Sequence, residues 1–90
     1  MATAANPLDV KQAAVIAIRY VKELIPDASD LALEEVEMSE RGNQWFVTVG
    51  FRRPDPNNFR AVLGQTERVY KQLAISRDTG EVVSMKIRTP

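Results

Sequence analysis

The chain has 90 residues, of which 44% are hydrophobic and 27% charged, a composition that predicts one small domain over residues 1–90 with a core of its own. Its formal net charge is zero, which argues against a dominant role in binding nucleic acid or a membrane surface. It contains neither cysteine nor histidine, so disulfides, thiolate chemistry and the commonest catalytic base and metal ligand are excluded.

Residues 1–6 are expected to form a flexible tail, followed by a helix over about residues 7–25. Asn6 is a suitable N-cap, Pro7 suits the first helical position, and Pro26 would end the helix. Apolar residues recur at helical spacing between these signals, at Leu8, Val10, Ala14, Ala17, Ile18, Val21, Leu24 and Ile25. The N-terminus lacks the features of a secretory signal, and no apolar run is long enough to span a bilayer, which predicts a cytoplasmic protein without a membrane role.

A first strand is expected within residues 31–40, but its apolar residues disagree in parity. Leu31 and Leu33 would point to one face of a regular strand, and Val36 and Met38 to the other. A β-bulge near Glu34–Glu35 would bring all four onto one face. The alternative is a short edge strand from Leu33 to Ser39.

The clearest strand, QWFVTVGFRR, follows a turn at Arg41-Gly42-Asn43. Its alternation places one set of residues in the core beneath the helix, namely Trp45, Val47, Val49 and Phe51. The opposite face carries Phe46, Thr48, Gly50 and Arg52. We expect the Trp45 indole N–H to need a hydrogen-bond acceptor, and Gly50 to mark a bulge or a bend against a bulky neighbour.

Residues 54–65 form the longest irregular segment. Pro54 and the Pro-Asn-Asn sequence after it break the strand, and Phe59–Gly64 is either one helical turn or a mobile excursion. Long irregular segments concentrate function and flexibility, so this loop is a candidate site.

Two further strands end the chain, joined by a tight turn. Asp78 and Thr79 suit the centre of a type I turn, and Gly80 suits the left-handed position that closes a bulged hairpin. In the strand over about 67–76, Val69, Leu73 and Ile75 share one face with Lys71, and Tyr70, Gln72 and Ala74 share the other. In the last strand, Val83, Met85 and Ile87 are expected on the core face, and Val82, Ser84, Lys86 and Arg88 on the outer face.

Together these elements predict an α+β fold, with one N-terminal helix packed on one face of a four-stranded antiparallel β-meander over about residues 31–89. The outer face of this two-layer sandwich would be left to solvent. Phe46 and Tyr70 are expected to stand near each other there, flanked by Thr48, Ala74 and Val82. An exposed apolar patch would make the outer face an interface, most simply of a homodimer.

Charge is distributed unevenly along the chain. Residues 1–49 carry a net charge of −4 and residues 50–90 a net charge of +4. Either the two halves attract each other in the fold, or they provide a polar recognition surface. The acidic cluster Glu34, Glu35, Glu37 and Glu40 is typical of a solvated strand edge that resists aggregation, and no metal or other cofactor is expected.

Arginines of the second half suggest a second use. Arg52, Arg53, Arg60, Arg68 and Lys71, with Phe46, Phe59 and Tyr70, combine the charges and aromatic rings of single-strand nucleic-acid binders. No recognisable nucleic-acid-binding motif accompanies them, and their ordinary role would be salt bridging with Glu67 and Glu81.

The alanine-rich leading helix, the strand QWFVTV and the segment VYKQLAISRDTGEVVSMK together resemble the PepSY domain and related cystatin-like folds, over residues 10–88. In that family the last two strands often flank an Asp-x-x-Thr-Gly-x-Val turn. The Thr79-Gly80-Glu81-Val82 portion matches, whereas Ser76 stands where an acidic residue is frequent. The resemblance implies regulation or inhibition of a peptidase, in a family that is usually secreted or membrane-attached.

The function expected from the sequence is a non-enzymatic binding or regulatory module, acting on a protein partner or on a second copy of itself. It would act through the outer sheet face or the 54–65 loop, with an interaction surface made of Phe46, Thr48, Arg52, Arg53, Phe59, Arg60, Tyr70 and Gln72. Peptidase regulation and weak nucleic-acid binding are the alternatives. No nucleophile–base pair suggests an enzyme.

Overall fold

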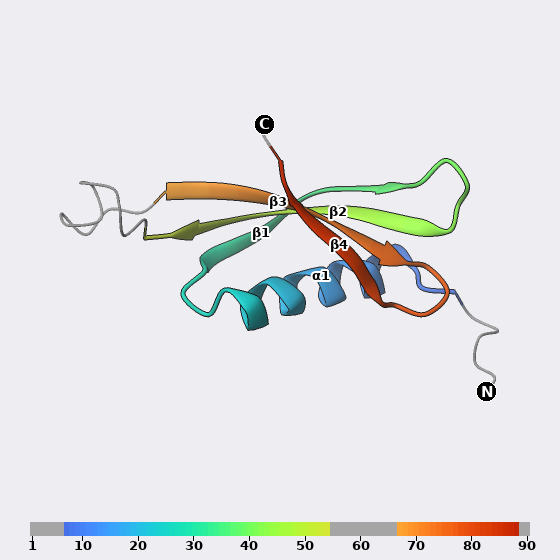
Figure 1. The fold of residues 1–90 in the computed structure, drawn as a ribbon, viewed down its shortest axis with the longest axis horizontal. Coiled ribbons are helices and arrows are strands. Elements are labelled where there is room, and N and C mark those ends of the chain that lie inside the picture. The colour runs from blue at the N-terminus through green and yellow to red at the C-terminus, as the bar shows by residue number, and fades with distance from the viewer. Residues whose placement is uncertain (1–6, 55–66, 89–90) are drawn as a thin grey trace.

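The structure, a computed structural model, describes residues 7–54 and 67–88. Within these ranges it has a helix, α1 (Val10–Leu24), and four strands, β1 (Ser29–Met38), β2 (Gln44–Arg53), β3 (Glu67–Ser76) and β4 (Val82–Ile87). The strands form an antiparallel sheet in the order β1-β2-β3-β4, and α1 lies against one face of it (Figure 1). The expected α+β sandwich of one helix on a four-stranded meander is therefore confirmed.

Helix α1 begins later than the sequence indicated, because Asp9 rather than Asn6 is the N-cap. The Asp9 carboxylate accepts a hydrogen bond from the Gln12 backbone N–H at 2.8 Å, and the Gln12 side chain accepts one from the Asp9 N–H at 2.9 Å. This capping box satisfies donors that a helix start leaves unpaired. The helix ends at Leu24, with Ile25 as its C-cap directly before Pro26, as expected.

The core lies between α1 and the inner face of the sheet. Val47, Val49 and Phe51 are fully buried, as predicted for this face of β2. The side of α1 that meets them presents Ala13, Ala17 and Val21, also fully buried, whose small size lets the helix approach the sheet closely. Val10 and Leu24, which the helical spacing had placed on the buried stripe, are exposed.

Strand β1 contains a bulge at Glu34, the first of the two possibilities that its apolar pattern left open, rather than being a short edge strand from Leu33 to Ser39. Leu33 pairs with Val49 but Glu35 pairs with Thr48, so Glu34 is the extra residue. Val36 and Met38 then pair with Val47 and Trp45 and share the inner face with Leu33. A second irregularity, between Ser29 and Ala32, contains Asp30, which has a φ of 55°.

Strand β4 contains a bulge that was not predicted. Ser84 pairs with Ala74 whereas Val82 pairs with Ile75, so Val83 is the extra residue. The assignment of Val82 to the outer face and of Val83 to the core was therefore wrong: Val82 packs against the core, and Val83 is 56% exposed. Ile87 was also misplaced in the core and is 76% exposed, since α1 packs against β1, β2 and β3 and Ile87 lies at the β4 edge.

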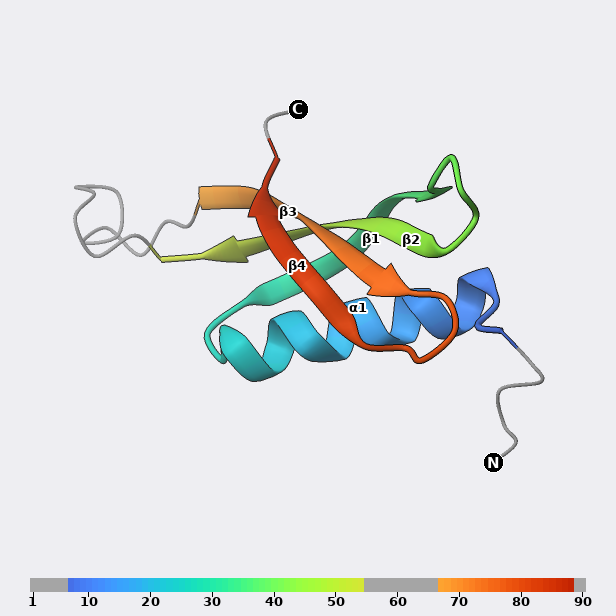
Figure 2. The same cartoon turned by 45° about the vertical axis from the view of Figure 1, so that its right-hand side comes forward.

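Hydrogen bonds tie together the segment before α1 and both hairpin turns, which lie at one end of the molecule (Figure 2). The Trp45 indole N–H donates to the Leu8 carbonyl at 3.0 Å, so the predicted need for an acceptor is met from the residue that precedes the N-cap. Leu8 N–H donates to the Arg77 carbonyl at 2.8 Å, and Arg77 N–H donates to the Asn43 carbonyl at 3.0 Å. Gly80 takes the left-handed conformation expected in its turn, with a φ of 77°, and Gly42 in the other predicted turn also does, with a φ of 74°.

Candidate functional site

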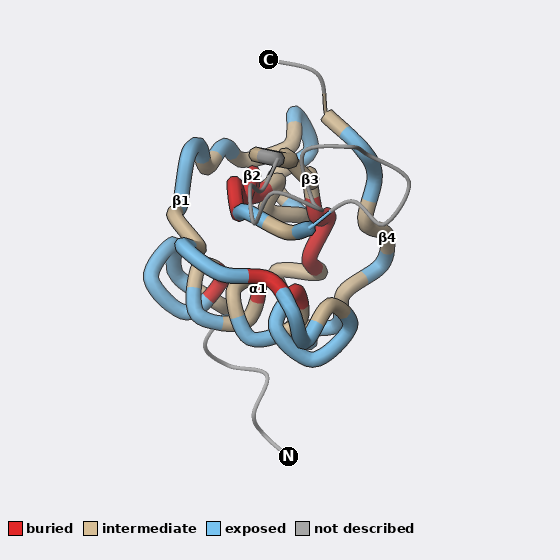
Figure 3. Tube along the Cα trace, turned by 90° about the vertical axis from the view of Figure 1, so that its left-hand side faces the viewer, coloured by how far each residue is buried: buried red, intermediate tan, exposed pale blue. Residues whose placement is uncertain are grey.

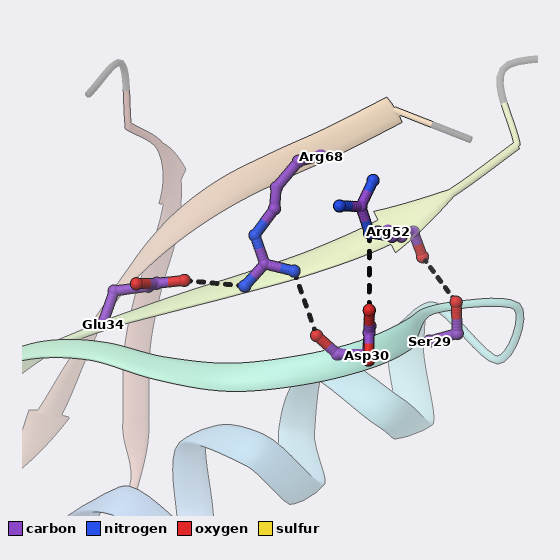
Figure 4. Close-up of polar contacts among 5 residues, drawn as sticks. All are labelled: Ser29, Asp30, Glu34, Arg52 and Arg68. Carbon is purple, nitrogen blue, oxygen red and sulfur yellow. Dashed lines mark hydrogen bonds and ion pairs between the residues drawn. The ribbon is translucent and has the colours of Figure 1, made fainter. Parts of the chain in front are cut away.

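The outer face of the sheet is crossed by ion pairs rather than being open. Arg68 of β3 reaches over β2 to Glu34 of β1, with 2.7 Å between Nη2 and Oε2 (Figure 4). Arg68 also donates to the Asp30 carbonyl at 3.1 Å, and the Asp30 carboxylate lies 3.4 Å from Nε of Arg52. Asp30, which makes both of these contacts, has a left-handed backbone conformation that is uncommon for residues other than glycine. The hydrogen bond to Glu34 raises the pKa of the Arg68 guanidinium above its ordinary value.

Gly50 is the reason that this crossing is possible. A Cβ placed at Gly50 would lie 2.5 Å from Oε2 of Glu34 and 2.9 Å from Nη2 of Arg68. Such distances are not tolerated, so the ion pair needs a residue without a side chain beneath it. The mid-strand glycine thus faces a bulky neighbour, as the sequence suggested, and that neighbour is the Arg68–Glu34 ion pair.

A second ion pair crosses the outer face of the sheet, next to the first. Arg88, directly after β4, lies 3.0 Å from the Glu35 carboxylate of β1 and 3.5 Å from the Thr48 hydroxyl. Thr48 is only 5% exposed although α1 lies on the opposite face of the sheet. The Arg88 side chain, which contacts both Thr48 and Glu35, contributes to the burial of Thr48 on this face.

These pairs explain the uneven charge distribution. The ion pairs among the described residues join acids of β1, namely Asp30, Glu34 and Glu35, to arginines of residues 50–90. The first interpretation of the charge asymmetry, attraction between the two halves, is thus supported. Arg52 and Arg68, two of the residues that suggested nucleic-acid binding, have their ion-pair partners on β1 rather than within the hairpin.

The expected aromatic patch is not formed. Phe46 pairs with Ala74 and Tyr70 pairs with Gly50, so the backbone positions of Phe46 and Tyr70 are offset by four residues along the strands, or about 13 Å. Arg68 lies over the Tyr70 ring at 5.9 Å, which gives that ring a cation as its neighbour. The prediction that Phe46 and Tyr70 stand side by side was therefore wrong.

The remaining residues of the expected interaction surface are divided. Thr48, Arg52 and Gln72 lie on the outer face, as the pairing of Thr48 with Gln72 shows. Arg53 pairs with Glu67 and has the parity of Phe51, so it does not share that face. Phe59, Arg60 and the 54–65 loop after Pro54 lie outside the described residues.

Exposed apolar side chains instead gather beside α1, where it runs along β1. A shallow groove of about 520 Å³ is lined by Ala14, Val15, Ile18, Arg19, Lys22, Glu23 and Leu33. Val15 is 55% exposed and Leu33 is 46% exposed, although Leu33 has the inner-face parity. Figure 3 shows α1 below the sheet with exposed stretches on its outward side and β1 descending beside it. We call this surface the α1–β1 groove.

The groove continues along the helix toward its N-terminus. A second hollow, of about 360 Å³, is lined by Leu8, Lys11, Gln12, Val15 and Ile16. Val15 lines both hollows and so joins them. The sequence analysis did not identify this surface. The sequence did contain one indication of an exposed apolar surface on the helix. Val15 is an apolar residue that lies off the buried stripe of α1, and Ile18 lies between Val15 and that stripe.

The fold and these surfaces define a small α+β domain of the helix-on-meander class, compatible with PepSY-like and cystatin-like folds. Searches with protein-family models, curated proteins and solved structures gave no match to this chain. In the described part of the chain, no helix has the length and hydropathy needed to cross a bilayer. Within the same residues, no three acidic side chains gather closely enough to hold a metal ion.

Proposed function

We propose that this chain is a non-enzymatic binding module that receives a partner protein in the α1–β1 groove. The observation that carries the proposal is the continuity of Val15, Ile18 and Leu33 across two elements, with Val15 and Leu33 about half exposed. Contiguous exposed apolar surface rimmed by polar residues is typical of interaction sites. Covering the exposed halves of Val15 and Leu33 would contribute about 1 kcal/mol each.

The outer sheet face is the weaker candidate for docking. A partner there would have to replace the contacts of Arg68 and Arg88 with β1. Separating these paired charges costs free energy, whereas covering exposed apolar groups gains it. The proposal therefore keeps the binding role expected from the sequence but moves it from the outer face to the opposite side of β1.

Site-specific photocrosslinking tests the proposal. The photoreactive residue p-benzoylphenylalanine is placed at Val15, or at the control position Val83, in cells that produce the protein. Val83 is an equally exposed valine on the far edge of the sheet. We expect a discrete adduct from position 15 and none from position 83. An adduct of twice the 10.1 kDa chain mass would identify a second copy as the partner. No adduct from position 15, or the same adducts from both positions, would refute the proposal.

Regulation of a peptidase is a second candidate, favoured by the compatibility of the fold with the PepSY and cystatin-like classes. It rests on the architecture and on the Thr79-Gly80-Glu81-Val82 turn. A panel of peptidases of different mechanistic classes, assayed with excess protein, tests it. Inhibition of one class would support this candidate, and unchanged activity of all of them at high micromolar concentration would eliminate it.

A further inference from the structure

The charges along the α1–β1 groove are predominantly positive. Lys11, Arg19 and Lys22 line it, with Glu23 as the acidic residue among the lining side chains. The ion pairs among the described residues involve none of these three cations. Lys22 donates a hydrogen bond to the Ala28 carbonyl at 2.8 Å, which neutralises no charge. The groove thus combines an apolar lining with three basic residues, of which Lys11 lies one turn before Val15 and Lys22 one turn after Ile18.

We propose that the occupant of the groove is a short amphipathic helix of another protein, with an apolar side and a net negative charge. This inference rests on the proposed function and specifies the chemistry of the partner. Charge complementarity favours carboxylates opposite Lys11, Arg19 and Lys22, where they would set orientation and raise the association rate. Apolar side chains at i, i+3 or i+4 and i+7 of the partner would form the side that packs on Val15, Ile18 and Leu33.

The dimensions of the groove favour a segment over a globular surface. Its lining runs from Lys11 to Glu23, a helical length of about 18 Å. That length matches about three turns of a partner helix. A stable interface between globular proteins covers about 800 Å² on each side, which is a broader surface than one short helix provides. Ala14, half-buried in the groove, lets the partner backbone approach closely.

Strand β1 argues for a helical rather than an extended occupant. An added strand would pair with the outer edge of β1, which is interrupted at Asp30 and Glu34. Bulges of this kind disturb the regular ladder that strand addition requires. A partner helix needs no backbone hydrogen bonds from β1, so the bulges do not affect its binding.

A second copy of the chain is a poor electrostatic match. Packing two α1 helices through this surface would bring Lys11, Arg19 and Lys22 of each copy together, with one Glu23 per copy to offset them. Like charges across an interface select against a pairing. A membrane surface is also less suitable, because the apolar centre lies in a hollow between a helix and a strand, where an inserted side chain fits and a flat lipid surface does not.

Selection from a random 16-residue peptide library displayed on phage, with the full chain as bait, tests the inference. We expect the enriched peptides to be net acidic, with apolar residues at helical spacing. A synthetic version of the enriched peptide, followed by fluorescence anisotropy, should bind Val15→Asp at least about tenfold more weakly. Val83→Asp, the matched control, should bind within about twofold of the unmodified chain. Val15→Ser repeats the test without a buried charge, and urea midpoints verify that each variant is folded.

Charge reversal separates this inference from the proposed function. The double variant Lys11→Glu and Arg19→Glu should weaken binding of the acidic peptide at least about fivefold, from two surface charge pairs of up to about 1 kcal/mol each. The same variant should enrich basic peptides. If the enriched peptides are neutral or basic, or if charge reversal has no effect while Val15→Asp does, the acidic partner is refuted and the groove remains the docking site.

Three other outcomes would also overturn the inference. Enrichment of no peptide is the first. The second is a dimer in sedimentation equilibrium that Val15→Asp dissociates, which would make a second copy the occupant. The third is Val15-dependent binding to phosphatidylglycerol vesicles that is tighter than binding to the peptide, which would make the occupant a lipid surface.

Discussion

Leu73 and Ile87 provide the sharpest test of where the core ends. Both were expected on the inner face of the sheet, but Leu73 is fully buried whereas Ile87 is 76% exposed. Leu73→Ala removes three carbon atoms, about 2.4 kcal/mol of transfer free energy, and leaves a cavity, so we expect a loss of about 3 kcal/mol in the free energy of unfolding. Ile87→Ala should change it by less than about 0.5 kcal/mol.

The expected difference is large for a domain of this size. Its total stability should be about 5–13 kcal/mol, so Leu73→Ala would remove roughly one fifth to three fifths of it. The unfolding temperature should fall by about 12–24 °C in that variant and stay within a few degrees in the other. Urea unfolding followed by fluorescence of the single tryptophan, Trp45, measures both free energies. Comparable losses in the two variants, or a larger loss at Ile87, would refute the placement of Ile87 outside the core.

Three further variants test local features of the fold by the same unfolding assay. Asp9→Ala removes the capping box and should cost about 1 kcal/mol, and no loss would mean that the helix begins elsewhere. Val82→Ala should destabilise by about 1 kcal/mol and Val83→Ala by less than about 0.5 kcal/mol, and the reverse order would contradict the bulge in β4. Gly50→Ala should leave the core intact but displace the Arg68–Glu34 ion pair that crosses β2. The free energy of unfolding of this variant should therefore depend less on salt than that of the unmodified chain. Equal salt dependence would show that the glycine is not required for the crossing.

Much of the fold could be predicted because few strand geometries are compatible with the observed positions of the apolar residues. The mismatch in parity between Leu33 and Val36 requires either an extra residue or a shorter strand, and the structure has the bulge. The second bulge had no such signal, because Val82 and Val83 are both valine and either can face the core. The parity of Val83 with Met85 favoured the wrong choice, which only the pairing with β3 corrects.

The candidate site could not be predicted because it depends on how side chains meet across elements. Arg68 was placed among possible nucleic-acid ligands, and its capture by Glu34 depends on the β1 bulge and on Gly50 together. Leu33 was assigned to the core, and its exposure depends on where α1 lies beside β1. Along the chain, Val15 and Leu33 are far apart, and no local pattern shows that they line one groove.

Two-dimensional ¹H–¹⁵N NMR of the labelled chain, titrated with the peptide selected on it, measures most directly which surface binds. If the α1–β1 groove is the docking site, the largest shifts will be at Val15, Ile18 and Leu33, and the amides of Thr48 and Tyr70 will be almost unchanged. Shifts concentrated at Thr48 and Tyr70, with Val15 unmoved, would place binding on the outer sheet face and contradict the assignment.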